Sequence, residues 1–112
     1  MVKLIQNKAL IEHSSDSKFA EAFSRIECHY FTNNGWFDTE NYLIENVDKI
    51  RHIPAVIVHG RYDVVCPVEN AWELHKAWPE SDLHIIPDSG HAMSEEGIKD
   101  KLIEYTDKFS KL

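Results

Sequence analysis

Two residues in this sequence, an acid and a histidine, have the types and spacing that could do chemistry. Asp63 follows the apolar segment 55–58, and His91 follows the apolar segment 83–86. Parallel strands joined by one crossover helix lie side by side, and their carboxyl ends share one edge of the sheet. We therefore expect Asp63 and His91 to meet. A carboxylate that orients an imidazole supplies two members of a nucleophilic triad, in which the imidazole takes a proton from a serine.

Each of these residues also has a simpler explanation. Asp63 could cap the helix that follows it, and His91 could be an ordinary residue of a surface loop. Gly60 and Gly90 lie just before them, and we expect these glycines to permit tight turns. Both candidates follow strands, at the edge where open α/β sheets place their sites. This combination favours the catalytic interpretation over either simpler one.

A nucleophile for this pair is not evident in the sequence. In α/β hydrolases the order along the chain is serine, then acid, then histidine, and the serine lies in a G-x-S-x-G turn. The sequence contains no such pentapeptide. Four serines precede Asp63, all in segments expected to be helical or to cap helices: Ser14, Ser15, Ser17 and Ser24. Ser89 and Ser94 come after the acid, in the wrong order. We therefore expect the chain to lack the nucleophile.

The first half of the chain is predicted to be helical. Residues 1–14 form a weak helical segment, and 17–31 a better one, in which apolar residues recur at three- and four-residue steps. Asn and Gly at 33–35 are expected to end this helix, because both tolerate a left-handed backbone. A shorter helix is predicted over about 39–50, capped by Asp38.

The second half is predicted to alternate strands and helices. Segments 55–58 and 83–86 are strands, and a helix beginning at Pro67 joins them. A last helix, capped by Ser94, follows. The fold class is therefore α/β: helices first, then two parallel strands with helices, the arrangement of half a doubly wound sheet.

Composition narrows the possible partners. The chain has 112 residues and a formal net charge of -7, which argues against nucleic acid and anionic membrane surfaces. It has no membrane-length apolar run and no signal-peptide pattern at the start. Two separated cysteines favour a reducing, cytoplasmic location. We expect no cofactor and no metal, because the scattered histidines show no ligand spacing: His52, His59, His75 and His84.

Several motifs resemble the C-terminal end of proline iminopeptidase, a family of serine peptidases with the α/β-hydrolase fold. The resemblance covers most of the chain, from about residue 17. It is carried by the segments 22–27, 29–31, 50–58, 60–67, 70–72, 76–79 and 89–91, which read AFSRIE, HYF, IRHIPAVIV, GRYDVVCP, NAW, KAWP and SGH.

This resemblance implies a division of the chain and a function. Residues 1–50 would be part of a helical cap, and 51–112 the C-terminal part of the hydrolase domain. Asp63 and His91 would belong to a Ser-Asp-His triad that releases N-terminal proline from peptides. The family is considerably longer, and its nucleophile lies in the preceding part. We therefore expect a C-terminal fragment that is inactive on its own.

Glu27 is the candidate for substrate recognition. Phe23, Glu27 and Phe31 lie four residues apart and form one row on the predicted helix. A carboxylate between phenyl rings is costly to bury unless it meets a cation, such as a protonated proline nitrogen. On spacing alone a solvent-facing Glu27 paired with Arg25 or Lys8 is preferred. The resemblance instead implies that Glu27 reads the free amino terminus and that Phe31 forms part of the proline pocket.

Cys66 follows Asp63 closely in the sequence. The resemblance implies that Cys66 lines the substrate pocket. The simpler explanation, that Cys66 is a small buried hydrophobe, is compatible with that role.

An alternative function needs no catalysis. The chain could be a docking module, or one piece of a split protein that pairs with an N-terminal half. A two-stranded parallel sheet cannot cover its own faces and edges. In this interpretation the isolated chain exposes the strand 55–58 and the apolar stripe of helix 17–31, and it is only marginally stable.

Overall fold

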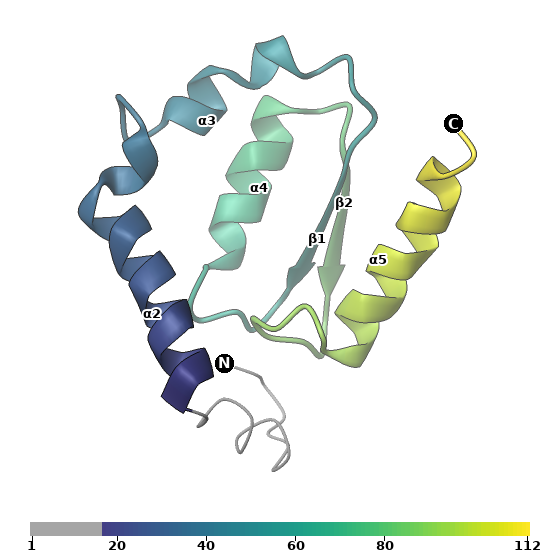
Figure 1. Ribbon diagram of the computed structural model, residues 1–112. Coiled ribbons are helices and arrows are strands. Elements are labelled where there is room, and N and C mark those ends of the chain that lie inside the picture. The colour runs from purple at the N-terminus through teal and green to yellow at the C-terminus, as the bar shows by residue number, and fades with distance from the viewer. Residues whose placement is uncertain (1–16) are drawn as a thin grey trace. The chain divides into compact units, whose positions relative to one another are not determined.

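The computed structural model describes residues 17–112, which form helices followed by a small sheet (Figure 1). The predicted helical segment 1–14 lies outside the described residues. The elements run in the order α2 (Ser17–Thr32), a 3-10 helix (Asn34–Trp36), α3 (Tyr42–Glu45), a 3-10 helix (Val47–Lys49), β1 (Val56–Gly60), α4 (Val68–Ala77), β2 (Asp82–Ile86) and α5 (Glu96–Phe109).

The described residues form two compact units. Among the described residues, the first unit runs from 17 to Tyr42 and the second is Leu43–Leu112. The predicted assignment of 1–50 to a cap and of 51–112 to a hydrolase domain stays a prediction.

Helix α2 matches the helix predicted over 17–31. Its last turn is closed by side chains, since Thr32 Oγ1 donates to the carbonyl of Cys28 at 2.7 Å and Asn33 Nδ2 donates to the carbonyl of His29 at 2.8 Å. The backbone then enters the left-handed region, with φ of 60° at Gly35. The predicted stop at 33–35 is therefore confirmed, and its physical reason is the one expected.

The single helix predicted over 39–50 is wrong. Only Tyr42–Glu45 is α-helical, and a 3-10 turn over Val47–Lys49 follows it. Asn46 separates them with φ −110° and ψ 6°, outside the helical region. Asparagine leaves helical geometry readily, because its side chain competes for local backbone hydrogen bonds. The apolar spacing alone did not reveal this break.

The strands form the predicted parallel pair. Val56 of β1 lies opposite Asp82 of β2, and Gly60 lies opposite Ile86 at the carboxyl ends. Helix α4 connects the strands and packs on both of them, and α5 packs on β1. Figure 1 shows α4 and α5 on opposite sides of the two strands. The predicted β-α-β-α order and the α/β fold class are confirmed.

Two helices begin next to the loops that carry Asp63 and His91. Pro67 is the N-cap of α4, as its missing N–H and fixed φ favour at a helix start. Glu95, not the predicted Ser94, is the N-cap of α5, and its carbonyl accepts the first helical hydrogen bond, from the N–H of Lys99 at 2.9 Å. The Glu95 side chain makes no capping bond, because its carboxylate is engaged in the preceding loop.

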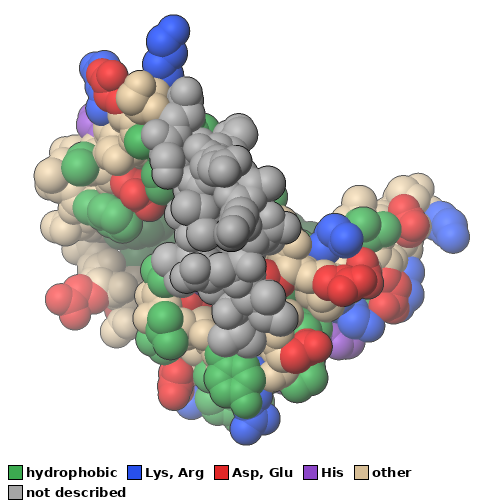
Figure 2. Space-filling model, turned by 90° about the horizontal axis from the view of Figure 1, so that it is seen from below, with side chains coloured by type: hydrophobic (Ala, Val, Ile, Leu, Met, Phe, Trp, Pro, Cys, Tyr) green, Lys and Arg blue, Asp and Glu red, His purple; other side chains and the backbone are tan. Residues whose placement is uncertain are grey.

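Many large hydrophobic side chains remain at the surface. On α2 no residue is buried, and Ile26 and Phe31 are 62% and 74% exposed. In the second unit Val64 is 82% exposed, whereas Val56 and its neighbours in β1 are half-buried, since helices cover them. Figure 2 shows hydrophobic side chains open to solvent among the charged ones. Within residues 17–112 no helix is both long and apolar enough to cross a membrane.

Candidate active site

The loops after β1 and β2 bring Asp63 and His91 together. His91 Nδ1 lies 3.0 Å from Asp63 Oδ2 and 3.1 Å from Oδ1. Only an Nδ1–H can donate to a carboxylate, so this contact selects that tautomer and leaves Nε2 free to accept a proton. The Asp63 side chain is 6% exposed and that of His91 is 37% exposed. The geometry is a buried acid that orients an accessible imidazole.

The Asp63 carboxylate is held by its own loop. Its Oδ1 accepts hydrogen bonds from the backbone N–H groups of Val65 and Cys66, both at 2.9 Å. These amides precede α4, so Asp63 does not cap that helix, whose N-cap is Pro67. Burial raises the pKa of Asp63, but the hydrogen bonds from Cys66, His91 and Val65 outweigh burial, and the pKa lies below its ordinary value. The carboxylate is therefore ionised at neutral pH.

This lowered pKa predicts a loss of stability in acid. An acid whose pKa is lower in the folded than in the unfolded chain stabilises the fold fully above the unfolded value, about 4 for aspartate. The contribution disappears as pH falls through the folded value. The transition should lie roughly between pH 5 and pH 2. Over this range we expect the urea concentration at the midpoint of unfolding to fall further in the unmodified chain than in Asp63→Asn.

The control for this pH series is Asp107→Asn, which changes an exposed aspartate on α5. Its midpoints between acid and neutral pH are expected to parallel those of the unmodified chain. Identical pH slopes for the unmodified chain and Asp63→Asn would contradict the lowered pKa.

Gly60 lets the two loops touch. A Cβ at this position would lie 2.0 Å from the carbonyl oxygen of Gly90 and 2.7 Å from that of Ser89. Beside this contact, the N–H of Tyr62 donates to the carbonyl of Ser89 at 2.9 Å. The expected tight turn is present, since the N–H of Asp63 donates to the carbonyl of Gly60 at 3.2 Å. Among the described glycines only Gly35 has a left-handed φ, so this turn does not itself require glycine at position 60. Gly60 is needed for close approach of two backbones.

His59 was missed as part of this site. Its Nε2 lies 2.9 Å from the carbonyl oxygen of Cys66 and 3.7 Å from Asp63 Oδ2. It therefore braces the loop that carries the acid. The available signal was its position at the end of β1, four residues before Asp63. Other histidines have local partners, as a structural role predicts: His75 contacts Ser81, and His84 contacts Tyr105.

Cys66 stands beside the pair, and its side chain is exposed. A carboxylate oxygen of Asp63, the thiol sulfur of Cys66 and a ring nitrogen of His91 all lie within 4.8 Å of one another. These donor types suit a borderline-soft metal ion such as Zn²⁺. The Asp63 carboxylate and His91 Nδ1 are already engaged with each other, and the absence of a metal from the function stays a prediction.

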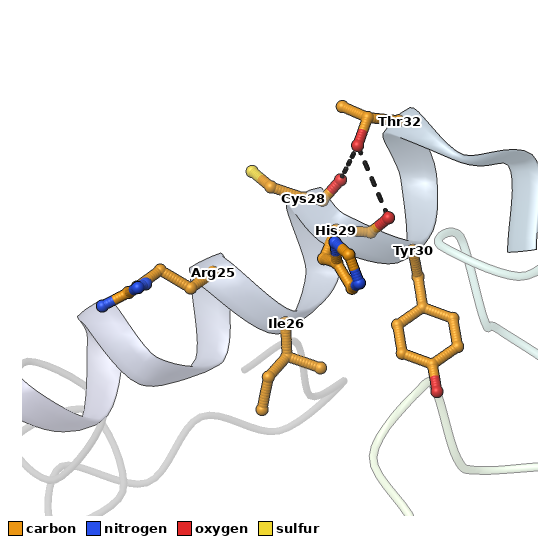
Figure 3. Close-up of a pocket in the computed structure, with 6 residues that line it drawn as sticks. All are labelled: Arg25, Ile26, Cys28, His29, Tyr30 and Thr32. Atoms are coloured by element: carbon orange, nitrogen blue, oxygen red, sulfur yellow. Dashed lines mark hydrogen bonds between the residues drawn. The ribbon is translucent and has the colours of Figure 1, made fainter.

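Glu27 and Phe31 lie on α2, in the first unit, so the structure does not relate them to Asp63 and His91. Both are exposed. Arg25, the alternative partner of Glu27, pairs with Glu21 at 3.7 Å. The same helix carries an open hollow lined by Arg25, Ile26, Cys28, His29, Tyr30 and Thr32. Figure 3 shows Ile26 and Tyr30 pointing to one side of α2, with the Thr32 hydroxyl at the carbonyls of Cys28 and His29.

The parallel β-α-β-α unit, with an acid and a histidine at adjacent strand ends, is consistent with the C-terminal part of an α/β hydrolase. No family model matches the chain. Individual proteins do. A probable proline iminopeptidase of Leptolyngbya boryana is 56% identical over 107 residues, 96% of this chain and 33% of that protein. A proline iminopeptidase of Arabidopsis thaliana is 51% identical over 102 residues, 91% of this chain and 27% of that protein.

A more distant bacterial relative agrees with them. The proline iminopeptidase of Neisseria gonorrhoeae is 43% identical over 89 residues, 80% of this chain. The resemblance to proline iminopeptidases inferred from the motifs is thereby confirmed over most of the chain. The chain spans about a third of the length of the curated relatives it matches.

Proposed function

We propose that this chain supplies the acid and the base of a proline iminopeptidase. The observation that carries the proposal is the contact between His91 Nδ1 and Asp63 Oδ2 at 3.0 Å, in a chain similar to proteins of that name. The site is a hydrolase site that needs no cofactor or metal. It acts on peptides with an N-terminal proline, in the cytoplasm, without a nucleic acid or membrane partner.

The proposed chemistry is acyl transfer to a serine that lies outside this sequence. The serine oxygen attacks the carbonyl carbon of the N-terminal proline residue, and its proton passes to His91 Nε2. His91 then returns the proton to the leaving amine of the next residue as the peptide bond breaks. Water attacks the resulting prolyl ester by the same base catalysis and releases proline. Throughout, ionised Asp63 stabilises the imidazolium and holds the ring by its Nδ1–H.

Glu27, Phe31 and Cys66 are the residues proposed to contact the substrate. Glu27 pairs with the protonated nitrogen of the proline, and Phe31 packs on the pyrrolidine ring. An aliphatic ring on a phenyl face and a cation beside a carboxylate are both favourable once water is excluded. Cys66 is proposed to line the substrate pocket beside the Asp63–His91 pair, and its exposed thiol near that pair supports this role.

The test compares the isolated chain with a hybrid enzyme. In the hybrid, this chain replaces the aligned segment of the Leptolyngbya boryana relative, to which it is 56% identical. We expect the hybrid to release proline from a prolyl-arylamide and the isolated 112-residue chain to release none. Loss of a triad nucleophile costs on the order of 10⁶ in turnover. Proline release by the isolated chain, or its absence from a folded hybrid, would contradict the proposal.

The alternative is a docking module that pairs with an N-terminal half without taking part in catalysis. The exposed hydrophobic residues of α2, such as Phe23 at 51% and Phe31 at 74%, favour a partner surface there. The hybrid separates the two candidates. A module that only docks leaves proline release insensitive to His91→Ala, whereas the catalytic proposal requires a nearly complete loss.

A further inference from the structure

The loop that carries His91 is held by a buried carboxylate that the triad does not use. Glu95 Oε2 accepts a hydrogen bond from the N–H of Gly90 at 3.0 Å, and Oε1 accepts one from the N–H of Ala92 at 3.1 Å. These two amides lie directly before and after His91. The Glu95 side chain is thus hydrogen-bonded to the backbone on both sides of His91.

Burial makes these two hydrogen bonds of Glu95 stronger than the same bonds would be at the surface. Glu95 is 8% exposed, and its neighbours Gly90 and Ala92 are also buried. A buried carboxylate is costly unless hydrogen bonds satisfy it, and bonds from N–H groups to an ionised oxygen are about twice as strong as neutral ones. Both carboxylate oxygens of Glu95 accept hydrogen bonds from the loop, so these bonds fix the side chain of Glu95 and the backbone of the loop together.

We propose that Glu95 is a positioning residue for His91, an inference that rests on the proposed function. Asp63 orients the imidazole ring through Nδ1, but it does not set where the Cα of His91 lies. Glu95 fixes that position, because it is the N-cap of α5 and its own backbone is held by the start of that helix. The contact of Gly60 with Ser89 and Gly90 holds the same loop against β1.

The geometry requires a glutamate. Two N–H donors converge on one side chain, so it needs two acceptor atoms. Glutamine has the same shape but one acceptor, and its NH₂ group would face an N–H donor. Aspartate has two acceptors but is one methylene shorter. Glu95→Gln therefore removes one of the two bonds with little change in side-chain volume.

The experiment is NMR on the isotope-labelled full chain, with Glu95→Gln compared with Glu96→Gln. Glu96 is the exposed neighbour on α5 and serves as the control. In Glu95→Gln we expect amide hydrogen exchange at Gly90 or Ala92 to accelerate at least about tenfold, the change expected for one lost hydrogen bond. We also expect the downfield signal of the His91 Nδ1–H to broaden or vanish. Glu96→Gln is expected to retain both.

A kinetic arm uses the hybrid enzyme. Glu95→Gln is expected to lower kcat by about 10- to 100-fold with KM unchanged, because the base is misplaced while the pocket is intact. The NMR arm needs no activity, so a hybrid without peptidase activity would defeat the proposed function and leave the positioning role to be decided by NMR. Unchanged exchange and an unchanged His91 signal would overturn the positioning role. Loss of folding in Glu95→Gln would also overturn it, in favour of a purely structural one.

Discussion

Replacing His91 by alanine is expected to lower kcat of the hybrid enzyme about 10⁶-fold, because removal of the histidine base from the triad of a serine protease lowers kcat by about that factor. The imidazole at 3.0 Å from Asp63 is the only group of this chain that the proposal assigns to proton transfer. No alanine side chain can take the serine proton, so the attack loses its base. The measurement is steady-state release of an arylamine from a prolyl-arylamide.

The matched control is His52→Ala, which removes an exposed histidine of the same unit. Its kcat is expected to stay within about twofold of the unmodified hybrid, since surface substitutions away from a site have small effects. Far-UV circular dichroism of both variants excludes unfolding as the cause. A His91→Ala hybrid with near-normal kcat would mean that this pair is not the catalytic one.

Asp63→Asn is expected to lower kcat of the hybrid enzyme about 10⁴-fold, as the equivalent change does in a serine protease. The reason lies in how Asp63 is held. The N–H groups of Val65 and Cys66 both donate to Oδ1, so the single carbonyl oxygen of an asparagine is drawn to them. Its NH₂ group then faces His91 Nδ1, which must accept.

This reversal places the imidazole proton on Nε2, the atom that must be free to act as the base. The expected signature is a large fall in kcat with KM nearly unchanged, because the carboxylate does not touch the substrate. Asp100→Asn on α5 is the control, since Asp100 is an exposed aspartate of the same unit. A fall of less than tenfold in Asp63→Asn would show that the acid does not set the tautomer.

Much of this architecture was predictable from local patterns. The apolar segments 55–58 and 83–86, and the helix between them, are confirmed as β1, α4 and β2. Their parallel pairing follows from general topology, and it brought Asp63 and His91 to one edge as expected. Hydrophobic period and crossover geometry are enough for this, because they depend on residue type along the chain and on a connection rule that nearly all such units obey.

Other features depended on contacts between segments. The spacing of apolar residues did not predict the break in the helix at Asn46. It also did not predict that His59 would contact the carbonyl of Cys66, in the loop that carries Asp63. Gly60 does begin the expected turn, but the feature that requires a glycine there is the close approach of the Gly90 backbone. Such roles are properties of two backbones at a given separation, which residue types alone do not encode.

Glu95 is the clearest example of a role that the sequence did not predict and that the tertiary structure revealed. In the sequence it is one of several acids around the start of α5, where a favourable interaction with the helix dipole is the ordinary expectation. Only the folded loop turns the N–H groups of Gly90 and Ala92 toward it. The meeting of Asp63 and His91 was thus predictable from local sequence. The support that holds the pair appeared only with the tertiary structure, because a hydrogen bond between loop and helix requires both to be in place.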